Sequence, residues 1–320
     1  MKLGVVMDPI SAINFKKDSS LSILLEAQSR DYELYYMEPT SLFLRENGAK
    51  ALMQSIVVKD DSQDWFKLSE SKETRLADLD MIIMRQDPPF DANYIYNTYV
   101  LESAEREGVK VVNKPRSLRD CNEKVFATEF PECCTPFLVT SNNLLLREFI
   151  EEHVDTVVKP LDGMGGSSIF RVRRTDPNIA VILENITERA ITKIMIQKYI
   201  PEIIEGDKRI LMIDGLPMGG AIARVPQEGE LRGNLAAGAT AVAKSLTSKD
   251  KWICNQVGPR LKELGLTLVG LDVIGDYLTE INVTSPTCFR EYKNLCGIDV
   301  AASLFDSLVG KVSQLTQRLE

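Results

Sequence analysis

Three oxygen-bearing side chains in the carboxyl-terminal part of the sequence could hold a metal ion. Glu280 and Asn282 lie two positions apart in a strand-like run, so they share one face. Ile281 and Val283 alternate with them and point to the other face, and Asp272 lies in the preceding apolar run. Carboxylate and amide oxygens are hard ligands that suit Mg²⁺, which also takes waters and substrate phosphates. A polar strand face in contact with solvent is the alternative.

A shared site at these residues needs a particular register between two strands. Gly275-Asp276 is typical of a two-residue turn, which would place Asp272 opposite Thr279 and on the wrong face for the glutamate. We therefore predict a three-residue turn or a bulge that shifts the register by one residue. Pairing of Ile274 with Tyr277 would refute that shift.

A glycine-rich turn between two β-branched runs could bind an anion. Gly163, Gly165 and Gly166 would let backbone N–H groups approach a phosphate closely. Ser167 and Ser168 add hydroxyl donors. The turn joins two predicted strands, so it is neither a dinucleotide-binding turn nor a P-loop, both of which open a helix. A tight hairpin without a ligand is the alternative.

Basic side chains accompany this turn. Lys159 directly precedes it, and Lys124 lies in the segment before it. Arg209 at the start of a strand and Arg232 in a Gly- and Ala-rich loop could each stabilise negative charge on a transferring phosphoryl group. Arg85 stands at the carboxyl end of a strand, where ligands of open α/β sheets bind. Each alone is also compatible with a surface residue or a structural ion pair.

The elements that must position these residues follow two patterns. Alternating strands and helices up to residue 113 predict a parallel sheet covered on both faces, so the fold class is α/β with additional α+β elements. After residue 114 strands follow one another, with a hairpin signal at Asp214-Gly215. Predicted strands are 2–8, 34–37, 81–84, 109–113, 156–159, 169–172, 194–200, 208–213, 218–223, 267–274 and 277–283. Predicted helices are 20–30, 97–107, 118–130, 143–153, 248–264 and 299–319, and 226–240 is predicted to be a mobile loop.

Composition excludes several classes of protein. The 320 residues carry a net charge of −8, which argues against binding to a nucleic acid backbone. No apolar run approaches the roughly 20 residues that span a bilayer, and the first residues lack the apolar segment of a signal peptide, so we expect a cytoplasmic protein. With one histidine, chemistry centred on a Ser-His or Cys-His pair is not expected.

Taken in order, these motifs resemble the prokaryotic glutathione synthetase family of the ATP-grasp superfamily. The resemblance runs along essentially the whole chain, and Gln86 departs from it where relatives commonly have lysine. It implies a substrate domain at 1–121, a central lid domain at 122–200 and a catalytic domain at 201–320. The stretches that carry it are 3–10, 84–90, 112–124, 159–172, 232–238 and 279–287.

The resemblance also implies a role for each candidate residue. ATP would contact Lys124, Lys159, Gly163, Gly165, Gly166, Ser167, Gln197, Lys198, Tyr199, Ile200 and Asp207. The metal ligands would be Asp272, Glu280 and Asn282, the catalytic residues Arg209 and Arg232, and the substrate-pocket residues Arg85, Ser285, Pro286 and Thr287.

The activity that the resemblance implies is the ATP-dependent ligation of γ-glutamylcysteine and glycine through an acyl phosphate. It would use Mg²⁺, with Mn²⁺ as the alternative, in a homo-oligomer that is a tetramer in the family. Another ATP-grasp ligase that joins a carboxylate to an amine is the nearest alternative. A nucleotide-binding regulatory protein without catalysis is a further alternative, against which the intact set of metal ligands argues.

Overall fold

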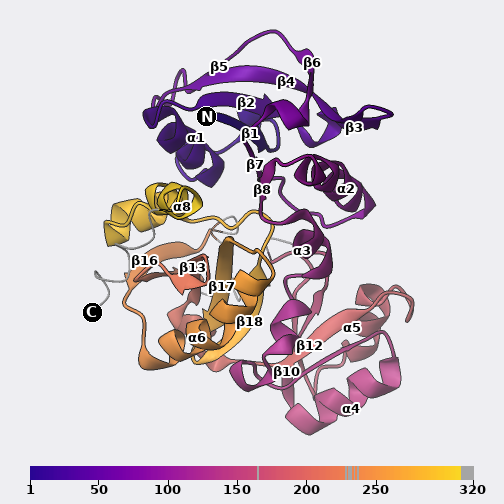
Figure 1. The fold of residues 1–320 in the computed structure, drawn as a ribbon. Helices are drawn as coiled ribbons and strands as arrows, with labels where there is room; N and C mark the ends of the chain where they lie inside the picture. Colours follow the sequence, from indigo (N-terminus) through magenta and orange to yellow (C-terminus); the bar gives the residue numbers. More distant parts are fainter. Residues whose placement is uncertain (164–165, 228, 230–232, 234, 236–237, 311–320) are drawn as a thin grey trace.

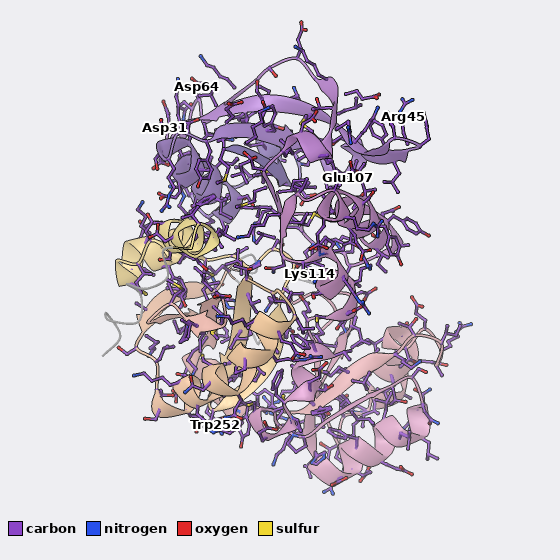
Figure 2. All side chains as sticks on the ribbon, viewed as in Figure 1. Asp31, Arg45, Asp64, Glu107, Lys114 and Trp252 are labelled. Carbon is purple, nitrogen blue, oxygen red and sulfur yellow. The ribbon has the colours of Figure 1, made fainter. Side chains whose placement is uncertain are left out.

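The computed structural model describes residues 1–163, 166–227, 229, 233, 235 and 238–310. Within these residues the strands form three sheets, and side chains fill the space between sheets and helices (Figures 1 and 2). The amino-terminal sheet lies at the top of Figure 1, and the other two lie below it. Among the described helices, none is both long and apolar enough to cross a membrane. The mixed α/β class agrees with the prediction.

The first sheet contains the predicted parallel strands. β1 (Lys2–Val6) lies between β2 (Glu33–Met37) and β7 (Met81–Met84), and β8 (Lys110–Val112) follows β7, all in parallel. Every residue of β7 is buried, as expected for a strand covered on both faces. The helices of this unit are α1 (Ser19–Ser29) and α2 (Ala92–Arg106).

An antiparallel extension of this sheet was not predicted. β4 pairs with β2 and carries a second set of strands on its other edge. Along β4, buried Ala51 and Met53 are separated by the exposed apolar Leu52, so local apolar periodicity is weak. The four strands are β3 (Leu42–Arg45), β4 (Gly48–Val58), β5 (Phe66–Leu68) and β6 (Lys72–Arg75).

The predicted helix at 118–130 is wrong. The helix α3 spans Pro115–Asp120, and a separate 3₁₀ turn covers Phe126–Glu129. Between them the side-chain oxygen of Asn122 accepts hydrogen bonds from the backbone N–H groups of Lys124 and Val125. Such a local bond competes with helix formation, and it leaves Lys124 on a turn that faces the interior.

The second sheet is antiparallel, with strand order β11-β10-β12-β9. Leu146 and Ile150 of one helix and Leu183 of another pack on Val158 and Ile196 of the sheet. This cluster is separate from the other cores and gives the second sheet its own apolar support. The elements are β9 (Phe137–Thr140), α4 (Asn143–His153), β10 (Asp155–Pro160), β11 (Phe170–Arg173), α5 (Ile179–Ile186) and β12 (Ile194–Lys198).

The third sheet is also antiparallel, in the order β16-β15-β13-β17-β18, with the short β14 beside β13. Its two faces enter different cores: Ile210 packs with the cluster of α6, and Leu211 with that of α8. The hairpin at Asp214-Gly215 is confirmed by the pairing of Ile213 with Leu216. The strands are β13 (Asp207–Ile213), β14 (Leu216–Pro217), β15 (Ala221–Val225), β16 (Thr240–Lys244), β17 (Leu268–Ile274) and β18 (Tyr277–Asn282). The helices are α6 (Ser248–Glu263), α7 (Phe289–Glu291), a π-helical turn at Tyr292–Cys296, and α8 (Val300–Leu308).

Two predicted segments fall partly outside the described residues. Of the loop expected at 226–240, residues 228, 230–232, 234 and 236–237 are not described, and Thr240 already belongs to β16, which was not predicted. Of the helix expected at 299–319, α8 covers 300–308, and residues 311–320 are not described.

A glycine in α6 contacts the hairpin that joins β13 to β14. A Cβ at Gly258 would overlap the backbone oxygen of Gly215, which itself adopts a φ of +79°. Because the obstacle is backbone, rotation of a side chain cannot relieve the contact. The close approach explains a glycine in the interior of a helix, where it costs about 1 kcal/mol relative to alanine.

We therefore expect Gly258→Ala to destabilise the protein although it raises helix propensity. The gain of about 1 kcal/mol in propensity should be outweighed by an overpacking cost of about 1–3 kcal/mol. Asn255→Ala, at an exposed position of the same helix, is the matched control and should be neutral or stabilising. The measurement is the urea midpoint of unfolding. A higher midpoint for Gly258→Ala would contradict the packing argument.

Candidate active site

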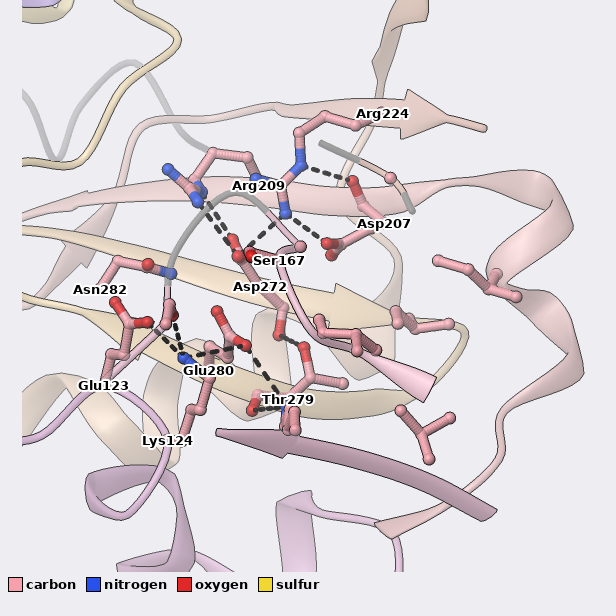
Figure 3. Close-up of a pocket in the computed structure, with 18 of the residues that line it drawn as sticks. Glu123, Lys124, Ser167, Asp207, Arg209, Arg224, Asp272, Thr279, Glu280 and Asn282 are labelled. Atoms are coloured by element: carbon pink, nitrogen blue, oxygen red, sulfur yellow. Dashed lines mark hydrogen bonds and ion pairs between the residues drawn. The ribbon is translucent and has the colours of Figure 1, made fainter. Parts of the chain in front are cut away.

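A cavity of about 710 Å³ opens where the three sheets meet. The second sheet supplies residues of β10 and β12, and the third sheet those of β13, β15, β17 and β18 (Figure 3). The amino-terminal unit supplies Asp87 and Pro88. Predicted site residues that line the cavity are Lys124, Lys159, Gly163, Gly166, Ser167, Gln197, Lys198, Tyr199, Ile200, Asp207, Arg209, Asp272, Glu280, Asn282, Ser285, Pro286 and Thr287. Segments that lie more than 160 residues apart in the sequence thus line one cavity.

The predicted register shift is present, but it does not arise in the turn. Ile274 pairs with Tyr277 across a two-residue turn, the pairing that was expected to argue against a shift. The ladder then slips between Asp272 and Val273, so that Asp272 pairs with Glu280 and Thr279 is the extra residue of a bulge. The bulge therefore places the two carboxylates on the same face.

Two arginines neutralise the carboxylate of Asp272. Arg209 donates to it through Nε at 2.6 Å and Nη2 at 3.0 Å, and Nη2 of Arg224 lies 2.9 Å away. All three residues are buried. Burial alone would raise the pKa of Asp272, but the two guanidinium groups outweigh it and hold that pKa well below its usual range.

Two lysines surround Glu280 in the same way. Nζ of Lys159 lies 3.3 Å and Nζ of Lys124 lies 3.9 Å from Oε1 of Glu280. Burial opposes ionisation of Glu280, but the lysines outweigh it and lower its pKa. Lys124 also donates to Oε1 of Glu123 at 2.5 Å and to the carbonyl of Gly163 at 2.8 Å (Figure 3).

The donor set fits a hard divalent cation. Nδ2 of Asn282 donates to the carbonyl of Gly270 at 3.3 Å, which leaves its Oδ1 available as a ligand. The oxygens of Asp272 accept from arginine and still have lone pairs for a metal. Among the described residues no three His, Cys, Asp or Glu side chains lie close enough to hold a metal together. A cation here would need the amide and oxygens from a bound phosphate, which is usual for Mg²⁺.

The glycine-rich turn closes one side of the cavity. Gly166 adopts a φ of +79°, in the left-handed region that favours glycine. Gly163, Gly166 and Ser167 line the cavity beside Lys124. Gly165 lies outside the described residues.

The far side of the cavity is formed by the end of β12 and the start of β13. Gln197 is buried, and Lys198 is exposed where β12 ends. The carboxylate of Asp207 forms an ion pair with Arg224, and its Oδ1 is buried without a hydrogen-bond partner among the described residues. Burial raises the pKa of Asp207 to about 7, although Arg224 opposes the shift.

The substrate-pocket candidates divide into two groups. Ser285, Pro286 and Thr287 line the cavity, and the hydroxyl of Thr287 lies 3.5 Å from Nη1 of Arg209. Arg85 is 4% exposed and does not belong to the lining; its Nε donates to the hydroxyl of Ser20 at 3.1 Å. The remaining catalytic candidate, Arg232, lies outside the described residues.

Sequence reasoning missed two charged residues of the site. Arg224 follows the predicted strand 218–223 by one residue and, in β15, pairs with Asp207 across the sheet. Glu123 precedes Lys124, and burial beside Glu280 raises its pKa. Alternation along β15 could have revealed Arg224, because Arg224 shares one face of the strand with the apolar residue Ile222. No local signal distinguishes Glu123 from a surface glutamate.

Comparisons with known proteins agree along the whole chain. Residues 123–297 match the ATP-grasp domain of prokaryotic glutathione synthetase, and residues 1–119 match its N-terminal domain. The glutathione synthetase of Pseudomonas putida is 55% identical over 312 residues, which cover 98% of both chains. That of Escherichia coli K12 is 52% identical over 314 residues, which cover 98% of this chain and 99% of the relative.

Solved structures show the same fold at much lower identity. D-cycloserine synthetase DcsG superposes with a TM-score of 0.68 at 13% identity, covering 97% of this chain and 99% of the other. The ATP-grasp ligase PsnB, complexed with a minimal precursor, gives a TM-score of 0.62 at 18% identity, covering 97% and 99%. With both domains matched and relatives more than half identical along nearly all of the chain, this protein belongs to the prokaryotic glutathione synthetase family.

Proposed function

We propose that this cavity joins γ-glutamylcysteine to glycine while ATP is converted to ADP and phosphate. Family membership supports the reaction, and one observation supports the cavity as its place. Two lysines, two arginines and two ionised carboxylates from separate segments converge on one face of the cavity, beside a glycine-rich turn. Transfer of a phosphoryl group depends on such fixed charges more than on covalent catalysis.

ATP would lie between the second and third sheets. Lys124, Lys159 and the turn at 163–168 would bind the phosphates, because ammonium and backbone N–H groups converge there. The segment 197–200 would hold the adenine, and the unpartnered Oδ1 of Asp207 would accept a ribose hydroxyl. These roles would place the γ-phosphate between the lysines and Arg209.

Asp272, Glu280 and Asn282 would hold Mg²⁺, or Mn²⁺ in its place, together with phosphate oxygens. The cation would supply neutralisation of charge on the transferring phosphoryl group. Around it, Arg209 would lie against the reacting phosphate, and Arg232 would cover the reaction from its loop. Arg224 would keep Asp272 ionised and in place.

The chemistry requires an activated carboxylate. A carboxylate oxygen of γ-glutamylcysteine attacks the γ-phosphorus, and ADP leaves. The amine of glycine then attacks the acyl phosphate carbon, phosphate leaves, and the nitrogen loses a proton to give the amide. Because an acyl phosphate hydrolyses in water, exclusion of water from the cavity during the reaction would protect this intermediate. Ser285, Pro286 and Thr287, with Arg85 behind them, would form the acceptor pocket.

Family membership also supports a proposal for the wider organisation. A substrate domain at 1–121, a lid at 122–200 and a catalytic domain at 201–320 would move relative to one another around ATP, in a cytoplasmic homotetramer. Large exposed apolar side chains on the amino-terminal unit support association of subunits. They are Leu44, Leu52, Val57, Tyr96 and Tyr99.

The reaction predicts which substrates release ADP. With ATP and Mg²⁺ present, we expect rapid ADP release only when both γ-glutamylcysteine and glycine are supplied. The reaction turns over only when the amine of glycine displaces phosphate from the acyl phosphate. Omission of γ-glutamylcysteine should abolish release. A coupled ADP assay with mass-spectrometric detection of glutathione measures both outcomes. An ATPase rate that neither substrate changes would contradict the proposal.

Metal binding predicts the effect of Glu280→Gln. The neutral amide keeps the shape but removes a charged ligand, so turnover should fall about 100-fold or more. Mn²⁺ affinity in the presence of a non-hydrolysable ATP analogue, measured by electron paramagnetic resonance, should fall at least about 10-fold. Glu263→Gln, on the exposed face of α6, is the control. Unchanged Mn²⁺ affinity would place the metal elsewhere.

The oligomeric state can be measured directly. Sedimentation velocity should give a single species of four chains, since exposed apolar side chains are buried in stable assemblies. Replacement of Leu44 and Leu52 by lysine should shift the distribution to smaller species if these exposed side chains are buried in the assembly. A monomer at micromolar concentration would contradict the tetramer.

A further inference from the structure

One carboxylate of the cavity differs from the others in its partners. Five carboxylates line the cavity, and four of them contact lysine or arginine: Glu123, Asp207, Asp272 and Glu280. Asp87 is the fifth, and among the described residues no basic side chain lies within 4.0 Å of it. Its Oδ1 accepts a hydrogen bond from the hydroxyl of Ser285 at 2.6 Å. Among the described residues, the cavity therefore has one carboxylate that no basic side chain pairs.

A backbone hydrogen bond positions Asp87. It lies in the segment that leaves β7 at the carboxyl edge of the parallel sheet, and its N–H donates to Oδ2 of Asp8 at 2.9 Å. Asp8 itself follows β1 at the same edge. Burial, together with the nearby charge of Asp87, raises the pKa of Asp8. Two strand ends thus fix the position of one carboxylate at the amino-terminal side of the cavity.

A positive group without an acceptor lies beside Asp87. Arg85 is two residues away and buried, and its Nη1 contacts no acceptor in the described part of the chain. The hydroxyl of Tyr94, which is fully buried near both residues, also has no partner there. Buried donors without acceptors are rare in folded proteins and call for a ligand or water. Among the described residues, the guanidinium of Arg85 and the carboxylate of Asp87 therefore lie two residues apart, and neither forms an ion pair within 4.0 Å.

We propose that Asp87 binds the α-ammonium of the γ-glutamyl group and so selects the dipeptide substrate. This inference rests on the proposed function. The γ-glutamyl α-carbon carries an ammonium and a carboxylate, so its complement is one anion and one cation a few ångströms apart. Asp87 supplies the anion, and the buried Arg85, two residues away and behind the lining, supplies positive charge that would favour the neighbouring carboxylate. The cysteinyl carboxylate would then lie on the side of Ser285 and Thr287, where the hydroxyl of Thr287 is 3.5 Å from Nη1 of Arg209.

The amine of glycine is a poorer match for Asp87. That amine must lose a proton to attack the acyl phosphate, and a carboxylate in contact with it would stabilise the unreactive ammonium form. The α-ammonium of the γ-glutamyl group stays protonated throughout the reaction. A permanent cation is thus the suitable partner for an unpaired carboxylate, since burial of either charge alone is costly.

The experiment combines one substitution with two substrate analogues. Glutaryl-cysteine lacks the α-ammonium, and 4-aminobutyryl-cysteine lacks the α-carboxylate. On the unsubstituted protein we expect glutaryl-cysteine to lose about 10- to 100-fold in kcat/KM relative to γ-glutamylcysteine, the loss expected for one charge-assisted hydrogen bond. In Asp87→Asn that ratio should fall to within about 3-fold of unity. The ratio for 4-aminobutyryl-cysteine should stay unchanged.

Further measurements distinguish a direct contact between Asp87 and the substrate from a structural role of Asp87. Asp87→Asn should raise the KM for γ-glutamylcysteine while the KM values for ATP and glycine stay the same. Asp64→Asn, on the outer surface of the same unit (Figure 2), is the matched control and should leave all three constants unchanged. Thermal unfolding of both variants reports on folding.

Two results would overturn the inference. Asp87→Asn could lower kcat/KM for γ-glutamylcysteine and glutaryl-cysteine by the same factor, which would indicate a structural role. It could instead raise the KM for glycine alone, which would assign Asp87 to the other substrate. Failure of the proposed function looks different, because the unsubstituted protein would then form no glutathione from any set of substrates.

Discussion

The compensation of buried negative charge constrains this structure more than any other interaction. An ionised carboxylate as deeply buried as that of Asp272 is stable only beside opposite charge, and here two guanidinium groups supply it. Those guanidinium groups come from β13 and β15, while Asp272 is on β17. The strand order β15-β13-β17 places the three side chains together, so sheet topology and charge balance depend on each other.

The same constraint explains how a ligand site can be both acidic and suited to phosphates. Glu280 and Asp272 would repel a nucleotide, but each contacts basic side chains that face the cavity. This pairing of charges leaves N–H donors of Lys124 directed towards the glycine-rich turn. It also leaves the side-chain oxygen of Asn282 on β18 available as a ligand. Nucleotide and cation can then bind side by side, because each is met by the charge opposite to its own.

Some of this could be predicted from sequence, and the reasons for success and failure are physical. The spacing of Glu280 and Asn282 fixes their common face within one strand, and the need for Asp272 on that face predicts a register shift. The place of the shift was not predictable, because a bulge at Thr279 depends on pairing with β17 and leaves no local mark. The strands at 42–75 were missed although Leu42–Arg45 and Gly48–Val58 pair as a local hairpin, because apolar residues such as Leu44 and Leu52 are exposed there and do not mark the buried face.

Errors near the site have a similar origin. The helix expected across 118–130 fails because the side chain of Asn122 takes backbone donors that a helix would use. That interruption is what directs Lys124 towards Gly163 and Glu280. Apolar periodicity reports which residues are buried, whereas the residues that break it decide where functional side chains point.

The three sheets contribute different parts of the cavity, which indicates where substitutions can change substrate specificity without changing the phosphoryl-transfer site. In the proposed function, the antiparallel second and third sheets surround the nucleotide, and the segment after β7, together with residues 285–287 after β18, forms the acceptor side. Structures with 13–18% identity share this fold, although one is named for D-cycloserine synthesis and another carries a precursor peptide. Because a fold hosts many functions, the charges that distinguish one carboxylate substrate from another should lie in the segment after β7 rather than on β17 and β18. Substitution of Asp272 or Glu280 would leave buried basic side chains without a counter-charge. Charged residues in loops at a sheet edge can be exchanged without disturbing the apolar core.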